Sequence, residues 1–146
     1  MTFLLDVNVL VALAWPNHVH HVAARSWFTG HAERGWATCP VSESGFVRVS
    51  ANPAVPHVVT PTEAMVLLER MRALAGHEFW NDEISLVASP HVDRERVVSH
   101  RHVTDAHLLA LARANEGRLA TFDRGLRRLL ARGQGDTSIL LIGPTG

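Results

Sequence analysis

Short apolar runs alternate with amphipathic stretches along this sequence, and that alternation limits the folds open to the chain. The runs at 2–5, 36–39, 118–122 and 139–142 have the length of strands, and the stretches between them carry apolar residues at helical spacing. Strands that alternate with helices are typical of α/β domains, in which crossover helices make the sheet parallel. The sequence therefore predicts an α/β fold with a mainly parallel central sheet.

Helix ends are marked by capping residues, by proline in a first turn and by glycine after a last turn. These signals predict helices over 7–14, 40–50, 60–75, 105–116 and 126–132, with Thr60 and Thr104 as N-caps. A further helix is expected after Asn17, with Val19 and Val22 on its buried face and Gly30 at its end. One or two short strands are expected within 77–98, near 78–80 and 84–87.

The length of 146 residues suits one hydrophobic core, so we expect residues 1–146 to form a single domain. Apolar residues make up 47% of the chain and charged residues 19%, which argues against disorder.

Cys39 is the only cysteine, which excludes a disulfide within the chain and suits a reducing cytoplasm. The N-terminus lacks a basic leader, and no run reaches the roughly 20 apolar residues of a membrane span, so no membrane segment is expected.

Four acidic residues lie at or near the expected carboxyl ends of strands or at the start of helices. They are Asp6, Glu43, Asp105 and Asp123. Two of them follow a strand, one lies in the first turn of a helix after a strand, and one opens a helix. In open α/β sheets the ligand crevice lies beyond the carboxyl ends of the strands. A single aspartate at such a place is most often a cap or a turn residue, but four acids together predict a carboxylate cluster.

Clustered carboxylates repel one another, and some would take up protons unless a cation joined them. Oxygen ligands of this kind suit Mg²⁺ or Mn²⁺, which polarise a phosphate, activate a water molecule and stabilise a leaving oxygen. The four acids therefore indicate metal-dependent chemistry on a phosphate ester.

The residues around these acids resemble a known family. The segments LLDVNVLVAL at 4–13, PVSESGFVRV at 40–49, VTDAHLLALA at 103–112 and LATFD at 119–123 are similar to the PIN-domain family. The likeness is greatest to the VapC ribonuclease toxins of bacterial VapBC toxin–antitoxin pairs, particularly those of mycobacteria. It implies a three-layer α/β/α sandwich and Mg²⁺- or Mn²⁺-dependent endonucleolytic cleavage of RNA, with water as the nucleophile.

The resemblance also implies roles for single residues. The catalytic, metal-binding acids of the family correspond to Asp6, Glu43, Asp105 and Asp123, and its supporting polar residues to Asn8 and Thr121. The resemblance further implies a homodimeric toxin and a small cognate VapB-type antitoxin, which could inhibit by pairing an arginine with the carboxylates.

Two arginine-rich segments adjoin the last two acids, although the formal net charge of the chain is zero. Arg124, Arg127 and Arg128, with Arg132, have the spacing of one broad helical face that begins after Asp123. A second basic run, 94–102, includes Arg101 and ends before Asp105. We interpret both segments as contacts to the RNA backbone, and ordinary solvated surface is the alternative.

Two other functions are compatible with the residues alone. His18, His20 and His21 form H-x-H-H, which would suit a histidine-based zinc site if further ligands joined it. A non-catalytic module that binds a partner protein is the other alternative, with exposed aromatic residues as its contact surface. A dinucleotide site and a P-loop lack their glycine fingerprints. Cys39 is expected to be a buried thiol rather than a nucleophile.

Overall fold

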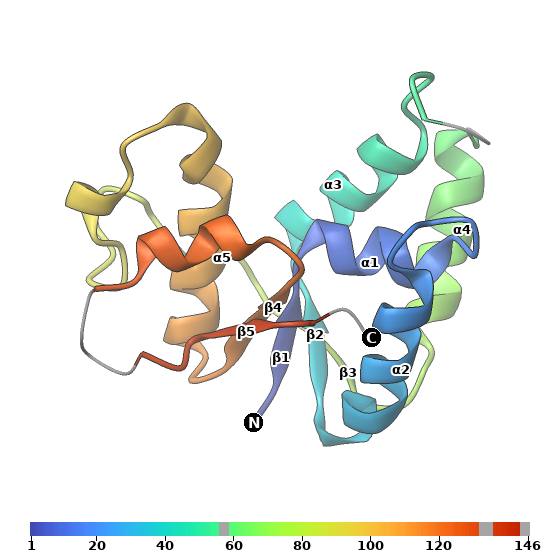
Figure 1. The fold of residues 1–146 in the computed structure, drawn as a ribbon, viewed down its shortest axis with the longest axis horizontal. Coiled ribbons are helices and arrows are strands. Elements are labelled where there is room, and N and C mark those ends of the chain that lie inside the picture. Colours follow the sequence, from blue (N-terminus) through green and yellow to red (C-terminus); the bar gives the residue numbers. More distant parts are fainter. Residues whose placement is uncertain (56–58, 132–135, 144–146) are drawn as a thin grey trace.

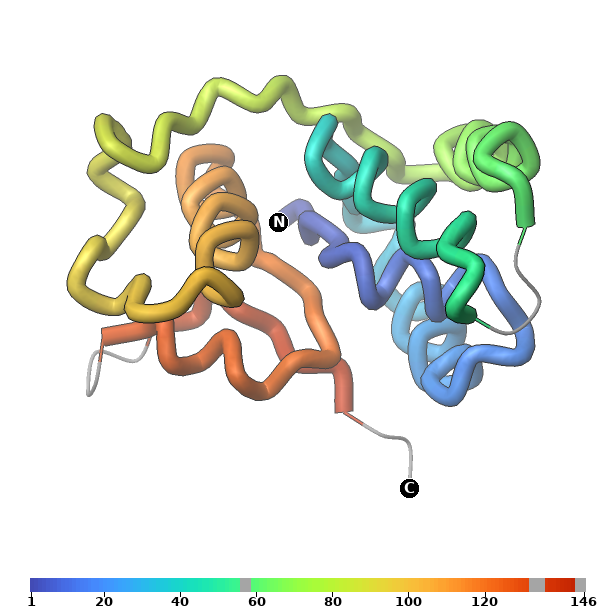
Figure 2. Tube along the Cα trace, turned by 90° about the horizontal axis from the view of Figure 1, so that it is seen from above, coloured from blue at the N-terminus to red at the C-terminus, as the bar shows by residue number. Residues whose placement is uncertain are grey.

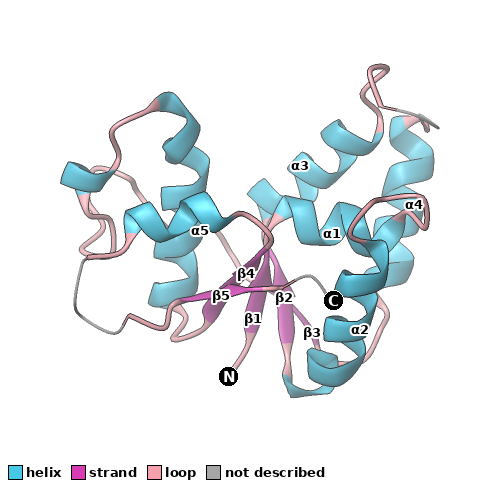
Figure 3. Ribbon diagram, viewed as in Figure 1, coloured by secondary structure: helices cyan, strands magenta, loops and turns pink. Residues whose placement is uncertain are grey.

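Within residues 1–55, 59–131 and 136–143, which the computed structural model describes, five strands form one sheet (Figures 1 and 3). Every neighbouring pair is parallel, and the strand order is β3-β2-β1-β4-β5. The strands are β1 (Phe3–Leu5), β2 (Trp36–Thr38), β3 (His77–Phe79), β4 (Arg118–Thr121) and β5 (Ile139–Leu141). The α/β class and the parallel sheet expected from the sequence are confirmed.

Helices cover both faces of this sheet, α5 on one face and the other four α-helices on the opposite face (Figures 1 and 2). In the described residues the α-helices are α1 (Val7–Ala14), α2 (His21–His31), α3 (Pro40–Ser50), α4 (Pro61–Arg72) and α5 (Val103–Ala114). Short 3₁₀ helices are η1 (Ala32–Arg34), η2 (Arg94–Arg96), η3 (His100–His102) and η4 (Arg124–Leu129). The three-layer α/β/α arrangement is therefore also confirmed.

The two faces of the sheet have separate hydrophobic cores. Successive side chains of a strand point to opposite faces, so Leu4 packs with α5 whereas Phe3 and Leu5 pack with α1, α3 and α4. The central strands are buried on both faces, which explains why they appear as uninterrupted apolar runs. In the described part of the chain we find no helix with both the length and the apolar character needed to cross a membrane.

Helices with strong local signals begin where the sequence predicts. Helix α1 has the predicted bounds, and α3 begins at Pro40 with proline in its first turn. Thr60 and Glu63 form the expected capping box of α4, with the Glu63 N–H donating to the Thr60 hydroxyl at 3.1 Å. Helix α4 ends at Arg72, before the predicted position, and Gly76 has a φ of 87° just before β3.

Several expected boundaries are wrong. Helix α2 begins at His21 rather than after Asn17, and Gly30 lies inside its last turn. The side chains of Val19 and Val22 are 86% and 71% exposed, so they are not core residues. The ring of His21 contacts the Ala12 carbonyl oxygen at 2.7 Å, and this contact to α1 fixes the start of α2.

The second half of the chain shows three further differences. Thr104 is not an N-cap, because α5 already begins at Val103. No strand forms over 84–87; a turn does, in which the Ser89 N–H donates to the Ser85 carbonyl at 2.9 Å. The predicted helix over 126–132 is the 3₁₀ helix η4, which begins directly after Asp123, and Arg132 lies outside the described residues.

Candidate active site

The strand order reverses between β1 and β4, and the candidate site lies where these two strands end. Asp6 follows β1 directly, and Asp123 lies two residues after β4. The two strands are neighbours, with Leu5 of β1 paired to Ala120 of β4. Ligand crevices of open α/β sheets form at such reversals, so the path of the chain delivers both acids to the expected place.

Asp6 is buried and held by hydrogen bonds from two sides. It caps α1, and its Oδ1 accepts the Val7 N–H at 2.7 Å. Its Oδ2 accepts the Thr121 hydroxyl at 2.7 Å. The buried Thr121 oxygen in turn accepts the Asn8 side-chain amide at 3.2 Å and the Asp123 N–H at 3.0 Å. Thr121 therefore connects the first acid to the last, and Asn8 supports it, at positions where the sequence predicts supporting hydrogen bonds.

Asp105 lies in the first turn of α5, and its carboxylate is electrostatically coupled to two other acids. Burial, followed by the negative charges of Asp6 and Asp123, raises the pKa of Asp105 to about 6. Burial also raises the pKa of Asp6, against the hydrogen bonds from Thr121 and Val7 and with a further contribution from the charge of Asp123. Asp6 and Asp123 therefore lie close enough to Asp105 for their charges to oppose its ionisation.

Glu43 is engaged by β2 and α4 rather than by the other acids. Thr38, the last residue of β2, donates its hydroxyl to Glu43 Oε2 at 2.6 Å. Arg72, in the last turn of α4, donates to Glu43 Oε1 at 3.4 Å. The structure thus brings the three aspartates together and leaves Glu43 in a separate ion pair. Arg72 was not identified from the sequence, since nothing local links it to an acid 29 residues away.

The expected cluster of four metal ligands is not formed in this structure. Among the described residues, no three side chains of His, Cys, Asp or Glu are placed to hold one ion together. The donor chemistry of Asp6, Asp105 and Asp123 nevertheless fits a hard divalent cation, because Mg²⁺ is usually held by one or two carboxylates and several water molecules. A cation would also offset the burial and the repulsion that together raise the pKa of Asp105 to about 6.

Comparison with known proteins agrees with this geometry. Residues 3–130 match the PIN domain. This chain belongs to the PIN-domain family. Ribonuclease VapC39 of Mycobacterium tuberculosis is 54% identical over 127 residues, which cover 86% of this chain and 91% of the relative. Ribonuclease VapC29 of the same organism is 39% identical over 141 residues, which cover 97% of each chain.

The fold of this PIN domain is also found in a solved structure of low sequence identity. The crystal structure of VapBC2 from Rickettsia felis, bound to a DNA fragment from its promoter, superimposes with a TM-score of 0.63. The match covers 88% of this chain and 93% of the other chain, at 13% sequence identity. It therefore supports the fold, and the mycobacterial relatives support membership among the VapC ribonucleases.

The arginines that we expect to bind RNA lie on two exposed segments of this PIN domain. Arg124, Arg127 and Arg128 are exposed on η4, and Arg101 is exposed on η3, just before α5. Because a 3₁₀ helix has three residues per turn, Arg124 and Arg127 share one side of η4 while Arg128 is turned away from it. The single broad α-helical face predicted for these residues is therefore wrong.

The histidines of the H-x-H-H sequence do not form the expected pair on one helix. His18 precedes α2, and its Nδ1 accepts the His20 N–H at 3.0 Å. None of the three histidines belongs to a group of three possible metal ligands in the described part of the chain. Cys39 is fully buried, and burial raises the pKa of its thiol, as expected for an unreactive thiol.

Sequence reasoning missed a pair that anchors α5 next to Asp105. His107 lies two residues further along α5, and its Nε2 contacts both carboxylate oxygens of Asp82 at 2.8 Å. The two side chains are only 18% and 19% exposed. Asp82 belongs to the segment after β3, so the pair ties this segment to the start of α5. The two residues are 25 positions apart, and no local pattern links them.

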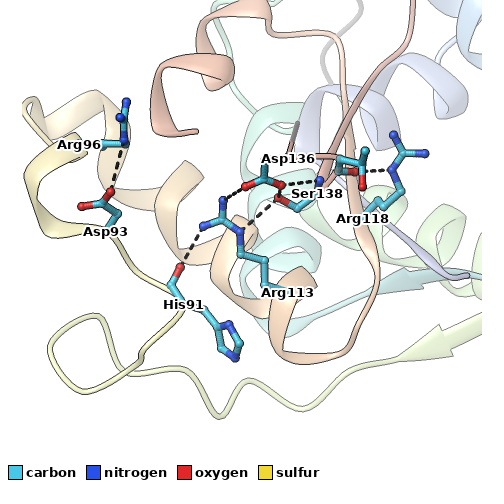
Figure 4. Close-up of polar contacts among 8 residues, drawn as sticks. His91, Asp93, Arg96, Arg113, Arg118, Asp136 and Ser138 are labelled. Carbon is cyan, nitrogen blue, oxygen red and sulfur yellow. Dashed lines mark hydrogen bonds and ion pairs between the residues drawn. The ribbon is translucent and has the colours of Figure 1, made fainter. Parts of the chain in front are cut away.

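The other end of α5 is anchored by Arg113 (Figure 4). Its guanidinium donates to the Asp136 carboxylate at 2.6 Å, to the Ser138 hydroxyl at 3.1 Å and to the His91 carbonyl at 3.1 Å. Although burial opposes the shift, hydrogen bonds from Ser138 and Arg113 lower the pKa of Asp136. Helix α5, which carries Asp105, is therefore held at both ends by polar side-chain contacts.

Proposed function

We propose that this PIN domain, residues 1–146, is a metal-dependent endoribonuclease that acts as the toxin of a type II toxin–antitoxin pair. The observation that supports this proposal best is the coupling of Asp6, Asp105 and Asp123 at the point where the strand order reverses. Repulsion among neighbouring carboxylates destabilises a fold unless a bound cation neutralises their charge, so such a group is typical of a functional site. The sequence identity of 54% and 39% to two VapC ribonucleases supports RNA as the substrate class.

The chain's own residues would hold the metal ion and orient its ligands. When bound, Mg²⁺ or Mn²⁺ would neutralise charge on the phosphate and lower the pKa of water. Asp6 and Asp123 would serve as metal ligands, with Thr121 fixing the orientation of Asp6. Asp105 would join them as a third ligand, because a bound cation would favour the ionised form of a carboxyl whose pKa is about 6 in the metal-free protein.

Glu43 is proposed as the fourth acid of this site, a role that requires a rearrangement. Its carboxylate is now shared between Thr38 and Arg72. The side chain of Arg72 is 41% exposed, so breaking the ion pair would cost only about 0.2–1 kcal/mol. Glu43 can therefore leave Arg72 at little cost, and the buried Thr38 hydroxyl would keep its contact to His77 Nε2 at 2.8 Å.

The proposed partners follow from the same assignment. RNA would meet the exposed Arg101, Arg124, Arg127 and Arg128, whose phosphate contacts add affinity without sequence choice. A VapB-type antitoxin and a homodimeric toxin are further proposals, supported by the VapC relatives and by exposed apolar side chains on α2 and α4. The proposed compartment is the cytoplasm, which suits a chain with one buried, unpaired cysteine.

Cleavage of labelled single-stranded RNA by the purified protein tests the proposal. We expect cleavage with Mn²⁺ or Mg²⁺, no cleavage after chelation, and none by Asp105→Asn. The matched control is Glu33→Gln, which neutralises an exposed carboxylate on η1, before β2 and away from the site, and should cleave at the wild-type rate. Cleavage by Asp105→Asn at the wild-type rate would show that the site is wrongly assigned.

A further inference from the structure

An exposed aromatic stack adjoins the candidate active site on the side of α1 and α2. The ring of His20 lies on the ring of Phe122, with centroids 4.7 Å apart and planes inclined by 14°. Phe122 stands in the chain between Thr121 and Asp123, and its N–H donates to Asn8 Oδ1 at 3.3 Å. The stack is therefore attached directly to the segment that holds two of the site's polar residues.

The inner layer of this stack is fixed and the outer layer is open. Phe122 is partly buried and packs against the core on the α1 face of the sheet. His20 is exposed. The ring of His18 is also near it, with centroids 5.8 Å apart and planes inclined by 43°, so the His18 ring is tilted and does not stack on His20. The backbone of His20 is also held, because its N–H donates to His18 Nδ1 at 3.0 Å. A flat ligand would thus meet a preformed surface.

The local structure does not explain why a ring is needed at position 20. His20 is the N-cap of α2, but its side chain makes no capping hydrogen bond. Neither His20 nor its neighbours His18 and His21 belong to a three-ligand metal group among the described residues. The pKa of His18 is lowered by burial and then by the charges of His20 and His21, so His18 resists protonation in this loop.

We propose that the open face of His20 receives an unpaired nucleobase of the RNA, next to the phosphodiester held at the acids, and extends the Phe122–His20 stack by one layer. Single-stranded RNA is recognised by stacking of splayed bases on aromatic and histidine rings, and every base offers a suitable face. The inference rests on the proposed ribonuclease function and adds to it a contact for one nucleotide beside the cleaved bond.

This contact favours unpaired over duplex RNA, because a base inside a helix has both faces occupied by its neighbours. It also favours purines at the stacked position, since a larger ring system overlaps the imidazole more fully. Phosphate contacts by the arginines would not distinguish bases. Residue 20 is therefore a specificity-determining position of the proposed reaction.

Binding measured without cleavage tests the stack. In the full-length Asp105→Asn protein, which should bind RNA but leave it intact, His20→Ala is compared with His20→Phe and with the control Val19→Ala in the same exposed loop. The probe is single-stranded RNA that carries 2-aminopurine at one position, moved stepwise along the strand. We expect its fluorescence to be quenched at one position relative to the cleavage site.

His20→Ala should abolish that quenching and weaken RNA binding at least about 5-fold, the lower end expected for one stacked base. His20→Phe should restore both, and Val19→Ala should change neither. Wild-type cleavage combined with unchanged affinity and quenching in His20→Ala would overturn the stacking proposal alone. Quenching that depends on His20, combined with no cleavage by the protein that retains Asp105 in the presence of Mn²⁺ or Mg²⁺, would support the stack and overturn the proposed function. The absence of any RNA binding would overturn both.

Discussion

Neutralising Asp105 should stabilise the metal-free protein while abolishing its proposed activity. The pKa of this carboxyl is about 6 in the folded state against 3.8 as its ordinary value, chiefly because of burial and then because of Asp6 and Asp123. A difference of about two pH units corresponds to about 3 kcal/mol. Since Asp105 is partly exposed, solvent screening reduces this to about 1–2 kcal/mol.

The sign of the effect depends on pH. A raised pKa means that the folded state binds the proton more tightly than the unfolded state, so the contribution of Asp105 to stability is lost as pH rises from 3.8 through about 6. Asparagine is neutral throughout. Asp105→Asn should therefore raise the free energy of unfolding by about 1–2 kcal/mol near pH 7.5 and by close to zero near pH 4.

Urea unfolding in the presence of a chelator measures this difference, with Glu33→Gln as the control for loss of an exposed carboxylate. The control should change stability by less than about 0.5 kcal/mol at either pH. Adding Mg²⁺ should stabilise the wild type and should stabilise Asp105→Asn less, because a ligand stabilises the state that binds it. A destabilised Asp105→Asn at neutral pH, or a gain that does not vary with pH, would refute the assigned charge coupling.

Three further perturbations test the surroundings of the acids. Thr121→Val removes the buried hydroxyl that links the site and should cost about 2 kcal/mol in urea unfolding, with cleavage strongly reduced. The double substitution Arg127→Ala with Arg128→Ala should flatten the dependence of log RNA affinity on log salt by roughly 0.7 per lost contact, and an unchanged slope would make these arginines merely solvated. Arg72→Gln should free Glu43, lower the Mn²⁺ concentration needed for cleavage, and leave unfolding within about 0.5 kcal/mol of the wild type.

The elements that the sequence predicts correctly have their determinants close together in the chain. Helix α1 lies between Asp6, which caps it, and Pro16. Thr60 and Glu63 mark the start of α4 in the same way. The strands are recognisable because burial on both faces leaves them uniformly apolar. For Asp6 and Asp123, a strand followed by an acid was enough to predict a shared edge.

What the sequence could not predict depends on contacts between distant segments. The start of α2 is set by the ring of His21 against α1, although Asn17 offers a better local cap. Likewise, the engagement of Glu43 depends on Arg72, which another helix brings to it. Periodicity also cannot distinguish a turn from a strand at 84–87, where the described part of the chain offers no neighbouring strand to pair.

The anchoring of α5 can be understood from the cost of the charge that it carries. Mutual repulsion among the three aspartates would favour moving the start of α5 away from β1 and β4. The His107–Asp82 pair acts against this displacement at the start of the helix, and Arg113 does so at its other end. Both contacts join α5 to segments outside the sheet, so neither competes for the carboxylate of Asp105. These contacts thus hold α5 in place against the repulsion among the three aspartates, and neither contact takes part in the proposed chemistry.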